Sequence, residues 1–166
     1  MRGLQLKPRW RPAIPAELRS FAAFFRPILS QLAAYHWVYD ELPFRGGGGE
    51  DESFEHLIET VCSEGYIPPA TLLPKFAHYV IEDWADLYGF QKSPDVAATR
   101  RHLRESPTDY EWLSRTVDIC FFNVDGAWWE VYARDEALLA AVRQHVTRLP
   151  DITVQEKQLV ERVVAV

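Results

Sequence analysis

Residues 117–134 read VDICFFNVDGAWWEVYAR, with Asp125-Gly126 between two runs of aromatic and β-branched residues. Such runs favour β-strands, and an Asp-Gly pair between them favours a two-residue type I′ turn, whose central residues both need a positive φ. We therefore expect residues 117–133 to form an antiparallel hairpin that turns at Asp125-Gly126.

A two-residue turn makes Val124 pair with Ala127 and so sets the register of the hairpin, in which directly opposed residues share a face. One expected face is almost wholly apolar and is assigned to the core: Cys120, Phe122, Val124, Ala127, Trp129 and Val131. The outer face is mixed: Ile119, Phe121, Asn123, Trp128, Glu130, Tyr132 and Arg134. We expect Trp129 to be buried and Trp128 less so. The outer face is expected either to contact a partner or to lie under a helix.

Apolar residues at spacings of three and four predict helices on both sides of the hairpin. The expected helices span residues 15–42, 51–64, 74–88, 94–104 and 135–149, and Pro27 is expected to kink the first. Residues 152–154 favour a third strand, and 159–166 form either a fourth strand or a short helix, with the valines favouring a strand. The predicted fold class is α+β: a small antiparallel sheet built around the hairpin at Asp125-Gly126 and covered by about five α-helices.

The length of 166 residues fits a single globular domain over residues 1–166, with an extended basic lead at 1–14 and a flexible glycine loop at 46–50. The two cysteines form no disulfide framework and match no zinc-site spacing, so no metal or cofactor is expected. The chain has neither an apolar signal segment nor a run approaching the ~20 apolar residues of a membrane span. We therefore expect a cytoplasmic protein.

The formal net charge of −6 argues against general nucleic-acid binding, which requires a basic surface. Acidic residues are concentrated in one segment, because residues 36–64 hold eight of them against Arg45 alone. This segment is interpreted either as a solvated helix face or as an acidic patch that docks on a basic protein partner and steers association.

A binding surface is the first hypothesis for a functional site. Exposed aromatic rings flanked by acids are typical of interface hot spots. The candidate binding residues combine the outer hairpin face with the acidic segment: Trp128, Tyr132, Phe121, Glu130, Glu50, Asp51, Glu52 and Glu55.

An acid–base or metal site is the alternative. His78, Glu82 and Asp86 lie at positions i, i+4 and i+8 of the expected helix 74–88, a spacing that lines up an imidazole and two carboxylates. The same spacing also suits a solvated helix face. The basic residues Arg100, Arg101, His102 and Arg104 are likewise interpreted as an exposed helix face or a phosphate grip.

In general character, as an acidic, aromatic-rich α+β chain without a catalytic motif, the protein resembles bacterial immunity proteins that neutralise toxins, or small adaptors. The function expected from the sequence is accordingly a non-enzymatic protein-binding module. The alternatives are a small enzyme or small-molecule-binding protein with an aromatic pocket, and a structural homodimer built on the outer hairpin face.

Overall fold

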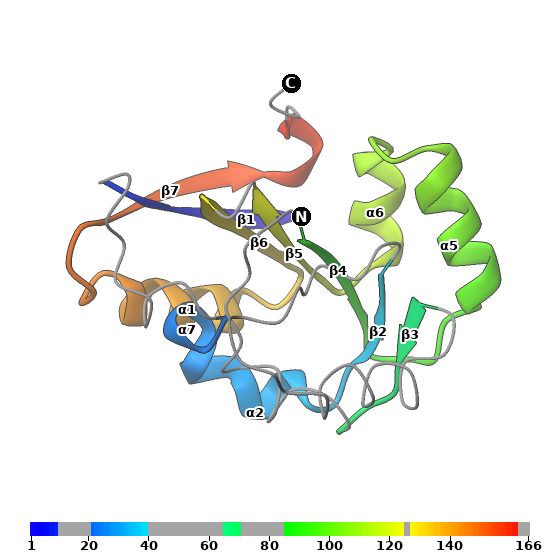
Figure 1. The fold of residues 1–166 in the computed structure, drawn as a ribbon, viewed down its shortest axis with the longest axis horizontal. Helices are drawn as coiled ribbons and strands as arrows, with labels where there is room; N and C mark the ends of the chain where they lie inside the picture. The colour runs from blue at the N-terminus through cyan, green and yellow to red at the C-terminus, as the bar shows by residue number, and fades with distance from the viewer. Residues whose placement is uncertain (10–20, 40–64, 71–84, 125–126, 163–166) are drawn as a thin grey trace, which may run out of the picture.

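The computed structural model describes residues 1–9, 21–39, 65–70, 85–124 and 127–162. These residues form one seven-stranded, wholly antiparallel sheet in the order β3-β2-β4-β5-β6-β1-β7 (Figure 1). The strands are β1 (Arg2–Pro8), β2 (His36–Val38), β3 (Tyr66–Ile67), β4 (Ala85–Phe90), β5 (Ile119–Val124), β6 (Trp128–Ala133) and β7 (Ile152–Gln158).

The predicted hairpin is present as β5 and β6, but its expected register is wrong by one residue. Val124 pairs with Trp128, so three residues separate the paired positions, and the Ala127 N–H donates to the Val124 carbonyl. Because a shift of one residue moves one strand's side chains to the other face, the expected core face mixes residues from both faces. Trp129 is 2% exposed and Trp128 is half-buried, as predicted. The turn residues Asp125 and Gly126 lie outside the described residues.

One face of the sheet, here called the α7 face, is covered by an interrupted helix and by α7 (Glu136–Val146) (Figure 1). The interrupted helix runs through α1 (Phe21–Phe25), the 3-10 turn η2 (Arg26–Ile28) and α2 (Leu29–Leu32). Pro27 explains the interruption, because proline lacks an N–H and cannot continue an α-helical ladder. The four apolar residues that recur at helical spacing in α7 are all buried: Leu138, Leu139, Val142 and Val146.

The opposite face, here called the α6 face, carries α5 (Val96–Glu105) and α6 (Tyr110–Thr116), with the 3-10 turn η4 (Leu159–Glu161) packed against α6. Asp95 caps α5 by accepting a hydrogen bond from the Ala98 N–H, and Asp109 caps α6 in the same way through the Trp112 N–H. Figure 1 shows both helices over the end of the sheet that holds β2, β4 and β5. The α6 face of the hairpin is therefore partly covered.

The expected fold class is wrong in the size of the sheet and in the number of helices. The sheet has seven strands and is not small, and within the described residues the helical segments are the interrupted helix, α5, α6 and α7, four instead of about five. Residues 85–88 belong to β4 and not to a helix. Tyr88 faces one core and Leu87 the other, and burial on both faces removes the alternation that marks a strand.

The ends of the chain are also arranged differently from the prediction. Residues 2–8, which belong to the expected extended basic lead, form the strand β1 between β6 and β7. The first helix ends at Leu32, well before residue 42, and residues 36–38 form β2. Strand β7 confirms the third strand, whereas residues 159–161 form a 3-10 turn where the valines favoured a strand. The expected helix 51–64 and the glycine loop 46–50 lie outside the described residues.

Candidate functional site

The four hairpin residues predicted to bind a partner do not share one surface. Phe121 lies on the α7 face, 4.6 Å from the Phe25 ring, and is fully buried. Tyr132 and Glu130 lie on the α6 face and are 1% and 7% exposed. Trp128, on the same face, is half-buried and is the one of the four that reaches the surface. Glu50, Asp51, Glu52 and Glu55 lie outside the described residues.

The alternative acid–base site is not assembled within the described part of the chain. Asp86 lies on β4, where its carboxylate accepts a hydrogen bond from the Tyr88 hydroxyl at 3.3 Å. Because Asp86 belongs to a strand, it does not continue a helical line from His78 and Glu82, which themselves lie outside the described residues.

A buried carboxylate, Glu130, organises the centre of the α6 face. Its Oε1 accepts from Gln5 Nε2 at 3.0 Å and from Trp128 Nε1 at 3.4 Å. Its Oε2 accepts from the Tyr132 hydroxyl at 3.2 Å and from Arg162 Nε at 2.7 Å. Both oxygens are thus engaged by donors from two strands, β1 and β6, and from the C-terminal segment, which makes Glu130 an anchor and not a free acid or base.

Arg162 completes this network from above the sheet. Its Nη1 donates to the Tyr110 hydroxyl at 2.7 Å, and its guanidinium lies 4.1 Å from the centroid of the Phe122 ring. Burial alone would lower the pKa of Arg162, but Tyr110 and Glu130 outweigh burial and raise it. The guanidinium therefore stays charged while it stacks on an aromatic ring and neutralises Glu130.

Two buried groups, Tyr132 within this network and Cys120 next to it, have raised pKa values. Burial, reinforced by Asp86, raises the pKa of the Cys120 thiol. Burial and then Glu130 raise the pKa of the Tyr132 hydroxyl. Both groups hold their protons at neutral pH, so Cys120 has little thiolate with which to act as a nucleophile.

Next to the buried network, the sheet carries a polar surface that we call the Trp128 platform: Gln5, Lys7, Trp128, Thr153 and Gln155. These residues share the α6 face, and Lys7, Thr153 and Gln155 are exposed. Lys7 Nζ lies 4.6 Å from the centroid of the Trp128 ring. Arg9 reaches the same area, since its Nε donates to Thr153 Oγ1 at 3.3 Å. In Figure 1 neither α5 nor α6 extends over β1 and β7.

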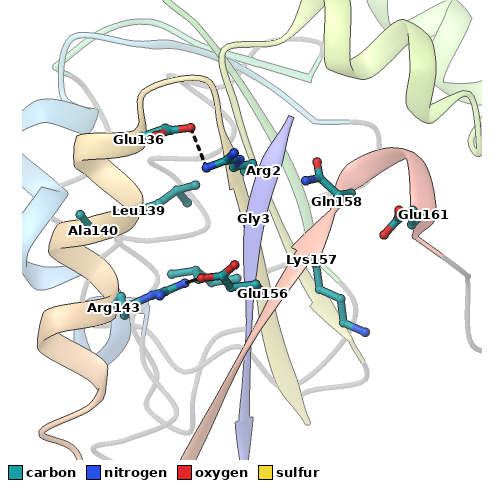
Figure 2. Close-up of a pocket in the computed structure, with 11 residues that line it drawn as sticks. Arg2, Gly3, Glu136, Leu139, Ala140, Arg143, Glu156, Lys157, Gln158 and Glu161 are labelled. Carbon is teal, nitrogen blue, oxygen red and sulfur yellow. Dashed lines mark hydrogen bonds and ion pairs between the residues drawn. The ribbon is translucent and has the colours of Figure 1, made fainter.

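A second feature lies on the α7 face, where α7 meets β1 and β7. Here an open groove of about 450 Å³ has an apolar part formed by Leu4, Leu139 and Ala140 (Figure 2). Two exposed ion pairs bridge α7 to the sheet across it. Arg2 Nη1 lies 3.2 Å from Glu136 Oε1, and Arg143 is paired with Glu156.

The charges of the groove are set by these pairs. The hydrogen bond and charge of Arg143 lower the pKa of Glu156. Figure 2 shows Lys157 pointing away from Arg143 and Glu156, while Glu161 adds a carboxylate at the rim. The groove combines residues from the ranges 2–4, 136–143 and 156–161, so no local sequence pattern identifies it. The alternation of Leu4 and Leu6 with Gln5 and Lys7 was the available signal for β1.

The predicted basic cluster lies on α5 and is partly used within the protein. His102 stacks on the Trp112 ring at 4.1 Å, and its Nε2 lies 3.2 Å from Asp109 Oδ2. These contacts join α5 to α6 and give the imidazole a structural role.

The described residues contain no group of three or more His, Cys, Asp or Glu side chains positioned to hold a metal ion. Within the same residues, none of the helices combines the length and apolar character needed to cross a membrane. Comparisons with protein-family models, with curated proteins and with solved structures give no match. The function is therefore inferred from the residues that lie on the two faces of the sheet.

Proposed function

We propose that the protein is a non-enzymatic protein-binding module that contacts its partner through the Trp128 platform. The observation that carries this proposal is the half-buried Trp128 ring beside the part of the sheet, β1 and β7, that the described helices α5 and α6 leave uncovered (Figure 1), with Lys7 against it. A role of the immunity or adaptor kind, in which a binding surface takes the place of a catalytic centre, fits such a surface.

Trp128 is held firmly in the free protein. Its indole N–H donates to the buried Glu130, which Arg162 and Tyr132 fix in turn. A ring that is already ordered loses little conformational entropy on binding, and a partner that covers it gains apolar burial without leaving the N–H unsatisfied.

The charges around the platform indicate what the partner presents there. Lys7, Arg9 and Lys157 lie on or beside the platform, and the neighbouring acid Glu130 is buried and paired with Arg162. A partner segment that carries carboxylates is therefore complementary to the platform. The acidic residues Glu50, Asp51, Glu52 and Glu55 are proposed to steer the approach of a basic region of the same partner.

The test is affinity purification from the source cells with three baits: the wild-type protein, Trp128→Ala and Trp112→Ala. Trp112 is a matched control, because it is also partly buried but lies on α6, where it packs on His102 of α5. A partner recovered by wild type and Trp112→Ala, and rebound by purified Trp128→Ala at least about tenfold more weakly, supports the proposal. Equal affinity of all three purified proteins for every recovered partner contradicts it.

A further inference from the structure

We infer that the outer edge of β7 receives an extended segment of a different protein, which adds to the sheet as an eighth strand. This inference rests on the proposed function, since it names a second contact of the same binding module. β7 has seven residues and ends the sheet, and no described strand pairs with it on the side away from β1.

The hydrogen-bond alternation of β7 shows which backbone groups are available. At one end the Leu159 N–H donates to the Met1 carbonyl, and at the other the Arg9 N–H donates to the Asp151 carbonyl. In an antiparallel pair only alternate residues bond to the neighbouring strand. The odd-numbered residues of β7 therefore bond to β1, and the N–H and C=O groups of Ile152, Val154, Glu156 and Gln158 point outward.

The side chains of these same four residues lie on the α7 face, so an added strand places alternate side chains beside them. Ile152 and Val154 are half-buried apolar residues at the edge, and Glu156 lies in the groove. Apolar side chains opposite Ile152 and Val154, followed by a basic one opposite Glu156, complement this row. On the other face an acidic side chain opposite Lys157 completes the pattern.

A second copy of this chain fits the edge poorly. Two copies of β7 can pair antiparallel about a two-fold axis in three registers that overlap by five or more residues and that keep each face of one sheet continuous with the same face of the other. They set Glu156 opposite Val154, opposite Ile152 or opposite another Glu156. The first two leave an apolar residue against a charge, and the third opposes like charges. Charged edge residues of this kind prevent self-association and leave the edge to a complementary chain.

The probe is a capped synthetic peptide, Thr-Glu-Lys-Thr-Val-Thr-Val, which supplies the complementary pattern in antiparallel register. The control peptide exchanges its Glu and Lys and so keeps the composition. We expect the first peptide to slow amide hydrogen exchange at Val154 and Glu156 by about tenfold or more, with Gln155 and Lys157 unchanged. The control peptide is expected to bind about fivefold more weakly.

Gln158→Pro removes one outward N–H and leaves the bonds to β1 intact, so it is expected to weaken peptide binding, whereas Gln158→Ala is not. If the proline variant does not fold, the exchange pattern of the wild-type protein decides. Unchanged exchange at Val154 and Glu156, or protection that rises with protein concentration and a dimer mass in sedimentation, overturns the inference. The peptide pairs with β7, and β1 and β7 separate it from Trp128 on β6. Failure here therefore leaves the Trp128→Ala result standing, and the reverse also holds.

Discussion

Arg162 Nε lies 2.7 Å from Glu130 Oε2, and both side chains are more than nine-tenths buried. This pair joins the last described residue of the chain to the middle of β6. It therefore fixes the C-terminal segment over the α6 face, beside the proposed binding platform.

Replacing Arg162 by Leu is expected to lower the free energy of unfolding by about 3–5 kcal/mol, because it leaves the Glu130 carboxylate buried without its cation. Urea denaturation measures the loss. Arg148→Ala, at an exposed site, serves as the control. The double variant Glu130→Leu/Arg162→Leu is expected to lose less than the sum of the single variants. Strict additivity would show that the two side chains do not act as a pair.

Stability is expected to fall at alkaline pH. Burial is the main cause that raises the pKa of Cys120, and the negative charge of Asp86 adds to it. Burial likewise raises the pKa of Tyr132, and the negative charge of Glu130 adds to it. The folded state thus keeps protons that the unfolded chain releases above about pH 8.5 for cysteine and about pH 10 for tyrosine. This stability is complete below those values and is lost as pH rises. Urea midpoints between about pH 7 and 11 check the trend, and Cys120→Ala should flatten its first part.

The Cys120 thiol is expected to react slowly with a disulfide reagent at about pH 8 in the folded protein. Cys62 is replaced by Ser in this experiment, because it lies outside the described residues. Reaction should become fast once denaturant is added. Rapid labelling of the native protein would show that the Cys120 thiol is accessible, which would contradict its buried position in β5.

Gly3→Ala is expected to destabilise the protein by about 1–3 kcal/mol, because the new methyl group has no room. A Cβ at this position would meet the Tyr132 ring and would lie 2.5 Å from the Val131 carbonyl oxygen. Thermal unfolding measures the effect, with the exposed Gln155→Ala as the control. Equal melting temperatures would contradict the close packing of β1 on β6.

Neutralising Glu50, Asp51, Glu52 and Glu55 together as amides is expected to slow association with the purified partner while changing dissociation little. Long-range attraction acts on the encounter, and the loss should be greatest at low salt, where screening is weak. Surface plasmon resonance at two salt concentrations separates the rates. Trp128→Ala should instead speed dissociation. If neither set of changes alters either rate, the interface lies elsewhere.

The local pattern of the sequence was sufficient for two elements. The hairpin follows from two strand-forming runs around Asp125-Gly126, and α7 follows from a cap at Asp135 and an apolar stripe whose four members are all buried. The burial of Trp129 was also predicted. The hairpin and α7 depend on residues close together in the chain, where turn chemistry and helical spacing act directly. Trp129 is buried by Phe21 and Phe25, which lie far away in the sequence.

The tertiary structure alone decided the register, the size of the sheet and the sites. Helices cover both faces at β4 and β5, so Leu87 and Tyr88 are both buried and the alternation that would mark a strand is absent. Strand β1 pairs with β6 and β7, more than a hundred residues away, and this pairing brings Gln5 to Glu130 and Lys7 to Trp128. Contacts between such distant residues leave no periodic trace in the sequence. The Trp128 platform and the β7 edge consequently appear only when the sheet is assembled.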